Sequence, residues 1–280
     1  MTYSINIGGK LMDLSVAKVM GILNVTPDSF YSGSRSIDEA TVEFRVREMT
    51  DEGADIIDVG ACSTRPNSIQ IDTDEEMRRL RMGLRVIRKH YPDAVLSVDT
   101  YRSSVAKMCV EEYGVQIVND ISGGMADSDM FRTVANLGVP YVLSHIQGSP
   151  SDMSSHTEYV NLMDDILYYF SEKVQMLRDL GQKDIIIDPG FGFSKTLDQN
   201  YELLSHLDML QILELPILAG ISRKSMIYKL LGTDAESSLT GTTALNMTCL
   251  ERGSNILRVH DVKECKEVVR LYEQIKQYKA

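Results

Sequence analysis

The chain is short of positive charge. Its 280 residues hold 29 lysines and arginines against 40 aspartates and glutamates, which gives a formal net charge of −11. A protein that binds nucleic acid needs a basic face for the phosphate backbone, so this balance argues against nucleic acid as a partner. It does not exclude an anionic small molecule, because a site can be locally basic in an acidic protein.

Long apolar runs and paired cysteines are also missing. No run approaches the roughly 20 residues of a membrane span, so we expect no membrane partner. The four cysteines form no C-x-x-C pair and no zinc-finger spacing, and the N-terminus does not resemble a signal peptide. We therefore expect reduced thiols in a cytoplasmic protein. No low-complexity stretch or evident linker interrupts the sequence, which predicts one domain over residues 1–280.

What the sequence does contain is a series of eight short apolar runs, most of which end in a polar or charged residue. The segments between them mostly have helical character. Buried parallel strands that alternate with helices predict an α/β fold, the (β/α)₈ TIM barrel, whose usual length is about 250 residues. Polar groups at the strand ends would then gather at the barrel mouth, where such barrels carry out chemistry. The runs cover residues 18–24, 55–60, 94–99, 116–120, 140–145, 184–189, 217–222 and 255–260.

Three connecting segments have features of their own. Gly8 and Gly9 separate two arms of alternating residues, which predicts an N-terminal β-hairpin, and its position before the first strand suggests that it closes the barrel bottom. The connections 25–35 and 61–72 follow the first two barrel strands and are rich in Pro, Ser and small residues. Loops of this length on the catalytic face are commonly lids over a site.

Two helix starts can be located from capping residues. Thr73-x-x-Glu76 fits the capping box, in which the two side chains bond each other's backbone N–H groups. Asp261 precedes the last helical segment and is expected to cap it.

Basic residues follow the last two strands. Strand alternation sends Arg258 and His260 to the same side, which favours an anion site over a salt bridge to a neighbouring loop. The run 222–225, Ser-Arg-Lys-Ser, lies just after strand seven, where a helix could begin. Helix starts and the last two barrel loops both favour anions, although an ordinary solvated basic turn is the alternative.

Acceptors end three other strands. Asp99, Asn119 and Asp188 could bind a metal, act as bases or accept the N–H groups of a heterocycle, and the residues alone leave that choice open. Without a His or Glu partner at metal spacing the set is a poor metal cage, and a flat amino-pyrimidine would suit it. Asn24 ends strand one; its amide oxygen suits Mg²⁺ when the ligand's own phosphates supply the charge, but alone it is more typical of a turn.

Seven segments together resemble one family. MGILNVTPDSF (20–30) is similar to the opening signature of the dihydropteroate synthases. The resemblance continues, in order and on every catalytic-face segment, at residues 55–66 (DIIDVGACSTRP), 97–100 (SVDT), 119–124 (NDISGG), 188–195 (DPGFGFSK), 220–225 (GISRKS) and 258–262 (RVHDV).

The resemblance implies a transferase that condenses 6-hydroxymethyl-7,8-dihydropterin diphosphate with 4-aminobenzoate, giving 7,8-dihydropteroate and pyrophosphate in folate synthesis. It also implies Mg²⁺ held at Asn24 and a homodimer. It assigns pterin binding and catalysis to positions matching Asp99, Asn119, Asp188 and Lys224. It assigns the diphosphate to those matching Asn24, Thr64, Arg258 and His260, of which Arg258 and His260 are also catalytic. It assigns aminobenzoate to those matching Phe30, Thr64, Arg65, Pro66, Phe193, Lys224 and Ser225.

The sequence departs from the family pattern at a few loop positions. Ala61, Cys62 and Asn67 replace Gly, Glu and Gly, and Ile146 replaces Met. We expect these departures to bear on loop rigidity and inhibitor affinity more than on the reaction. Two other hypotheses remain: a folate-binding methyltransferase domain and a non-catalytic pterin-binding protein. Neither needs an intact diphosphate clamp, so the presence of Asn24, Arg258 and His260 favours the synthase.

Overall fold

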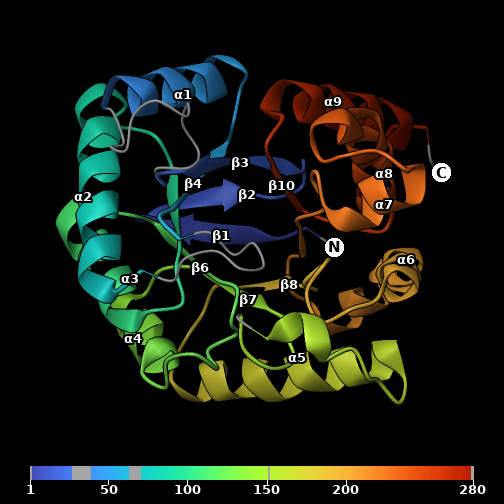
Figure 1. The fold of residues 1–280 in the computed structure, drawn as a ribbon. Coiled ribbons are helices and arrows are strands. Elements are labelled where there is room, and N and C mark those ends of the chain that lie inside the picture. Colours follow the sequence, from blue (N-terminus) through green and yellow to red (C-terminus); the bar gives the residue numbers. More distant parts are fainter. Residues whose placement is uncertain (1, 27–38, 63–70, 151, 279–280) are drawn as a thin grey trace.

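The computed structural model describes residues 2–26, 39–62, 71–150 and 152–278, and over these ranges it is the predicted barrel (Figure 1). Eight parallel strands form one sheet in the order β8-β7-β6-β5-β4-β3-β10-β9. A parallel bridge between Ile187 and Ile217 joins its two ends. The strands are β3 (Lys18–Asn24), β4 (Ile56–Gly60), β5 (Leu96–Asp99), β6 (Ile117–Asp120), β7 (Tyr141–Ser144), β8 (Ile185–Asp188), β9 (Leu218–Ala219) and β10 (Ile256–Val259).

Helices alternate with these strands and surround the barrel (Figure 1). Their apolar stripes pack against the outward-facing strand residues in one large core, as the spacing of Leu80, Leu84 and Ile87 illustrates. The helices are α1 (Glu39–Asp51), α2 (Thr73–His90), α3 (Ser103–Tyr113), α4 (Met130–Leu137), α5 (Leu162–Asp179), α6 (Leu197–Ser205), α7 (Ser225–Leu231), α8 (Leu239–Glu251) and α9 (Val262–Lys276). In the described part of the chain, every helix is too short or too polar to cross a bilayer.

The hairpin prediction is confirmed. Strands β1 (Ser4–Ile7) and β2 (Lys10–Asp13) pair antiparallel across Gly8 and Gly9, both of which have positive φ. Ile5, Ile7 and Leu14 form one apolar cluster with the inward-facing residues of the barrel, among them Met20 and Ile256. The hairpin therefore closes one end of the barrel with apolar side chains, which leaves the other end for polar ones.

The predicted cap bonds do not form, although Asp261 does occupy the N-cap position of α9. Helix α2 does begin at Thr73, but its cap is Asp72, whose Oδ1 accepts a hydrogen bond from the N–H of Glu75 at 2.8 Å. Glu76 is instead buried and bonds Thr100. Asp261 precedes α9 without a side-chain cap bond, because its carboxylate binds a guanidinium on another loop.

Candidate active site

The inner surface of the barrel changes from apolar to polar along the strands. The strand register places Gly60 beside both Asn24 and Asp99, and Asp99 beside Asn119. On the far side of the barrel, Asp188 lies beside Ser144. The structure thus brings the acceptors that end separate strands to one mouth, as the sequence predicts.

Arg258 holds the centre of this mouth through two carboxylates. Its Nε donates to Oδ2 of Asp58 at 2.7 Å, and its Nη2 donates to Oδ2 of Asp99 at 2.6 Å. The same oxygen of Asp58 accepts from Nδ2 of Asn119 at 3.0 Å. Asp58, which is completely buried, was not among the residues predicted for the site. It lies two positions before Gly60 on β4, so strand alternation could have placed it inside the barrel.

Burial disfavours the charged form of the carboxylates at the mouth, and neighbouring cations oppose this effect. Burial raises the pKa of Asp99 to about 7, an effect that the positive charge of Arg258 opposes. Burial also raises the pKa of Asp188, while Lys224 and the N–H of Gly190, 2.8 Å from Oδ1, act in the opposite direction. The negative charge of both carboxylates therefore depends on their cationic neighbours.

A tight turn follows β8 and depends on glycine. A Cβ on Gly190, whose φ is +70°, would lie 2.1 Å from the carbonyl oxygen of His145, and Gly192 leaves room for the stem of Lys224. The buried ammonium group of Lys195 fastens this turn, donating to the carbonyls of Gly190 and Phe193 at 3.1 Å each. Its Nζ also lies 3.1 Å from Nδ1 of His145.

Lys224 lies over the same turn. Its ammonium group donates to the carbonyl of Phe191 and lies 4.4 Å from the centre of the Phe193 ring, a cation–π contact. Burial lowers the pKa of Lys224 to about 8, although Asp188 acts to raise it. Ser225, the next residue, is the first of α7, so a helix does begin at the predicted point.

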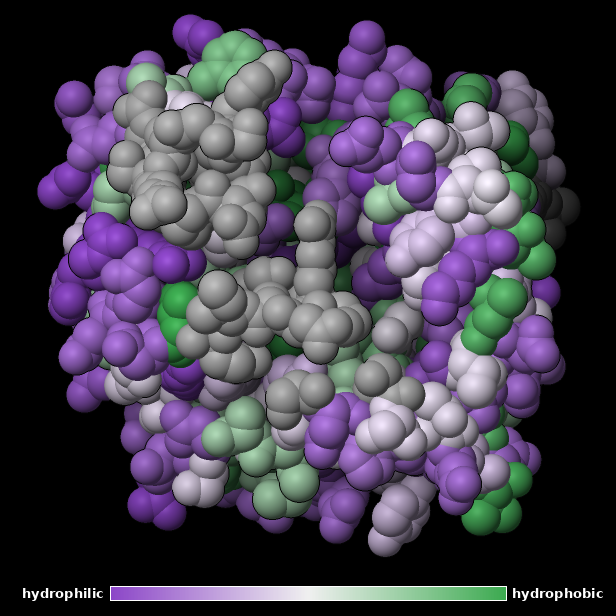
Figure 2. All heavy atoms as spheres, viewed as in Figure 1, coloured by the Kyte–Doolittle hydropathy of each residue, from purple (hydrophilic) through white to green (hydrophobic). Residues whose placement is uncertain are grey.

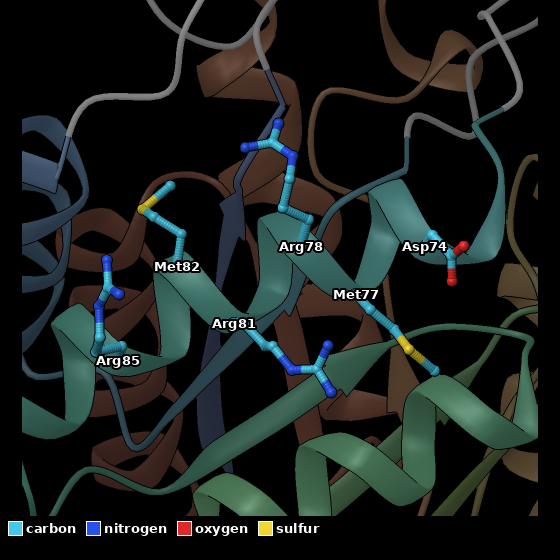
Figure 3. A pocket seen from close by; sticks show the side chains of 6 residues that line it. All are labelled: Asp74, Met77, Arg78, Arg81, Met82 and Arg85. Atoms are coloured by element: carbon cyan, nitrogen blue, oxygen red, sulfur yellow. The ribbon is translucent and has the colours of Figure 1, made fainter.

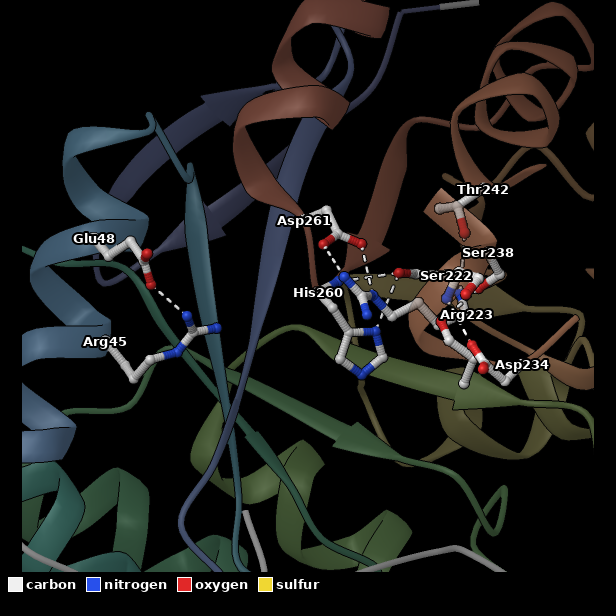
Figure 4. A network of polar contacts seen from close by, with 11 residues as sticks. Arg45, Glu48, Ser222, Arg223, Asp234, Ser238, Thr242, His260 and Asp261 are labelled. Atoms are coloured by element: carbon white, nitrogen blue, oxygen red, sulfur yellow. Dashed lines mark hydrogen bonds and ion pairs between the residues drawn. The ribbon is translucent and has the colours of Figure 1, made fainter. Parts of the chain in front are cut away.

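Arg223 adopts a strained backbone conformation that positions these groups. Its φ is +56°, which a non-glycine residue rarely adopts without support. Two hydrogen bonds to Asp261, at 2.9 and 2.6 Å, supply that support (Figure 4). Beside it, Ser222 Oγ lies 3.1 Å from Nδ1 of His260. The loops after β9 and β10 are thus joined twice.

Four buried polar atoms at inward-facing positions lack a hydrogen-bond partner within the described chain. They are Asp58 Oδ1, Ser97 Oγ, Asn119 Oδ1 and Ser144 Oγ. Buried polar atoms in native proteins are nearly always bonded, so their concentration in one barrel interior indicates a polar ligand or water there.

Comparisons with known proteins agree with this geometry. The family described as pterin binding enzyme matches residues 20–260. The chain belongs to the pterin-binding enzymes, and among them to the dihydropteroate synthase family. It is 41% identical to the dihydropteroate synthase of Clostridium beijerinckii over 249 residues, which cover 88% of this chain and 89% of that protein.

Solved structures of dihydropteroate synthases have the same fold. The Yersinia pestis enzyme in a sulfonamide drug complex superposes with a TM-score of 0.90 and is 35% identical, with 99% of this chain and 100% of that chain covered. The Xanthomonas albilineans enzyme with 4-aminobenzoic acid gives 0.89 at 32% identity, with 99% of each chain covered. Dihydropteroate synthases are transferases, and the chain belongs to this family.

Several residues that the family resemblance assigns to aminobenzoate lie outside the described ranges. They are Phe30, Thr64, Arg65 and Pro66, and Asn67 lies there too. Of the departures from the dihydropteroate synthase pattern, Ala61 and Ile146 are buried, and Cys62 Sγ lies 3.8 Å from Arg102 Nη1.

A hollow on the outer face of α2 is separate from the mouth (Figure 3). It is lined by Arg78, Arg81 and Arg85, but each of these pairs with a glutamate of α2, α3 or α1. Surface pairs of this kind neutralise the local charge. The hollow is therefore not a free basic surface, and the barrel mouth remains the candidate site.

Proposed function

We propose that the chain, acting as one pterin-binding (β/α)₈ domain over residues 1–280, is a dihydropteroate synthase that condenses 6-hydroxymethyl-7,8-dihydropterin diphosphate with 4-aminobenzoate. The observation that carries the proposal is the pairing of acceptors with cations at one mouth, in a chain that shares its family's fold throughout. A pterin presents several N–H donors, and a diphosphate presents negative charge. The mouth offers acceptor oxygens for the first and cationic side chains for the second.

The pterin would occupy the acceptor side of the mouth. Asp99, Asn119 and Asp188 supply oxygens for its N–H groups, and Lys224 lies on the same side, next to Asp188. The unpartnered Oδ1 of Asn119 supports this placement, because a ligand N–H would satisfy it.

The diphosphate would lie toward Arg258 and His260, with Asn24 and Thr64 as further contacts by family resemblance. In the reaction, the bond between the pterin methylene carbon and the diphosphate oxygen breaks, and its electron pair leaves with pyrophosphate. The arylamine nitrogen bonds to that carbon and loses a proton. Because 4-aminobenzoate is a weak nucleophile, stabilising negative charge on the leaving group by Arg258 and His260 is the main catalytic contribution that we assign to the protein.

We further propose Mg²⁺ as the cofactor, held at Asn24. A Cβ built on Gly60 would lie 3.5 Å from Asn24 Oδ1 and 3.7 Å from Asp99 Oδ2, so these two oxygens face one point of the mouth. Groups of three His, Cys, Asp or Glu that could cage a metal are absent from the described residues, which fits an ion bound mainly through the substrate's phosphates. When bound, Mg²⁺ would neutralise the diphosphate and favour its departure.

The aminobenzoate would lie beside the turn after β8. Phe193, Lys224 and Ser225 lie together there, and Lys224 contacts both that turn and, electrostatically, Asp188. Phe30, Thr64, Arg65 and Pro66 complete the pocket by family resemblance alone. This arrangement makes Lys224 a contact for both substrates.

We also propose a homodimer in the cytoplasm. Helix α8 carries no charged residue before Glu251, and Leu230, Leu231 and Leu271 are more than half exposed on the adjoining helices α7 and α9. Apolar patches are visible along this side of the molecule (Figure 2). A helix without charge over most of its length, flanked by exposed leucines, supports contact with a second copy. The four free cysteines fit a reducing compartment.

One assay separates this proposal from its alternatives. Pyrophosphate release should require both substrates together and should fall to background when 4-aminobenzoate is omitted. A folate-binding methyltransferase domain or a non-catalytic pterin-binding protein would release none under any condition. Release that did not depend on 4-aminobenzoate would indicate a diphosphatase and contradict the proposal.

A further inference from the structure

Asp58 contacts two residues of the proposed site without being one of its expected ligands. It is completely buried in β4, and one of its oxygens accepts hydrogen bonds from both Asn119 and Arg258. In the barrel interior Arg258 places an opposite charge beside Asp58, and Asn119 supplies an N–H donor.

The bond to Asn119 has a directional consequence. An asparagine amide has a donor end and an acceptor end, and its hydrogen-bond network decides which end points where. A carboxylate can only accept, so Asp58 takes the NH₂ end at 3.0 Å. The carbonyl end, Oδ1, is then the end left over, and it is buried without a partner in the described chain.

We propose that Asp58 is a positioning residue that sets the polarity of pterin recognition, by holding the amide of Asn119 with its oxygen toward the ligand. The proposal rests on the proposed function insofar as the ligand is a pterin. An oxygen at this point requires an N–H donor, and the exocyclic amine of an amino-pyrimidine carries two. A ligand that lacks this amine would leave a buried oxygen unsatisfied and would bind more weakly.

The test compares two ligands in four proteins. Calorimetric titration would use 6-hydroxymethylpterin and its analogue without the 2-amino group. We expect the unaltered protein to bind the pterin at least about 10-fold more tightly than the analogue. In Asp58→Ala the amide of Asn119 can turn over, so the preference should fall to about 3-fold or less. Asp58→Asn keeps an acceptor oxygen in place and should retain most of the preference.

The fourth protein controls for the loss of a buried aspartate. Asp120, at the end of β6, is equally buried but bonds Tyr141 and the backbone N–H groups of Ser122 and Gly124. Asp120→Ala should lower the stability of the protein, which thermal unfolding would measure for every variant. It should leave the ligand preference unchanged.

Three results would overturn the inference: an unaltered protein without a preference, an Asp58→Ala variant that keeps it, or an equal loss in Asp120→Ala. If Asp58→Ala does not fold, Asp58→Asn still tests the inference. This variant retains the acceptor oxygen, so a preference of only about 3-fold in it would also contradict the inference. Because only pterin binding is measured, failure here is distinct from failure of the proposed synthase, which pyrophosphate release reports.

Discussion

At the residue level, the barrel mouth gathers groups whose charges depend on one another. Arg258 is shared by Asp58 and Asp99, and Asp188 faces Lys224. Removing one member therefore changes the protonation or position of the next. Substitutions of single side chains test the roles of these groups.

Asp188→Asn should weaken pterin binding by about 1.5–3 kcal/mol, because a carboxylate that accepts ligand N–H groups becomes a group with one donor end. Calorimetric titration with 6-hydroxymethylpterin measures the loss. Asp184→Asn is the control, since Asp184 lies just before the opposite end of the same strand. Equal losses in the two variants would show that Asp188 does not contact the pterin.

Pterin affinity should depend on pH through Asp99. The pKa of Asp99 is raised to about 7, so the carboxylate that we propose as the acceptor of ligand N–H groups is present above that pH and lost as the pH falls through it. Arg258→Ala removes the charge that lowers this pKa, so the midpoint should move to higher pH. Titrations from about pH 5.5 to 9 would follow it, with Asp99→Asn as the variant that loses this transition. A midpoint that moves to lower pH in Arg258→Ala would contradict the assignment.

At the level of elements, the sequence predicts the strands and the hairpin well, since both depend on local alternation and on Gly8-Gly9. It predicts the caps poorly, because several acidic and hydroxyl residues compete at each helix start and tertiary contacts decide among them: Asp261 binds Arg223 in place of its own helix. Asp58 was missed because it lies within an apolar run, although its alternation with Gly60 indicated the interior. The contact of Lys195 with His145 joins two residues 50 positions apart in the chain and therefore has no local signal.

The hairpin should contribute stability without contributing to the site. Ile5→Ala should lower the free energy of unfolding by about 2–4 kcal/mol, since Ile5 is buried against the barrel interior, while KM for both substrates stays unchanged. Denaturant unfolding measures the change. Leu11→Ala, in the same hairpin but 77% exposed, should stay within about 0.5 kcal/mol. A raised KM in Ile5→Ala would show that the two ends of the barrel are coupled.

The loops after β9 and β10 should act as one unit. Asp261→Ala removes both bonds that support the strained Arg223, so Lys224 and His260 should lose their positions and KM should rise for both substrates. Steady-state kinetics with each substrate varied would show it. Asp208→Ala, which breaks the exposed pair with Arg252, is the control and should change neither KM. Unchanged kinetics in Asp261→Ala would remove this pair from the site's support.

At the level of the whole molecule, the apolar side chains of the hairpin close one end of the barrel, and the polar mouth lies at the other end. The net charge of −11 does not prevent binding of a diphosphate, because Arg258 and Lys224 are concentrated where the strands end. The described fold and the family membership together support the proposal that the condensation takes place at this mouth.

The most direct measurement follows isotopically labelled 4-aminobenzoate and pyrophosphate in the same reaction. The proposed function predicts that label enters 7,8-dihydropteroate in a one-to-one ratio with the pyrophosphate released, and that both signals disappear when either substrate is withheld. Pyrophosphate that appears without labelled dihydropteroate would contradict the proposed function.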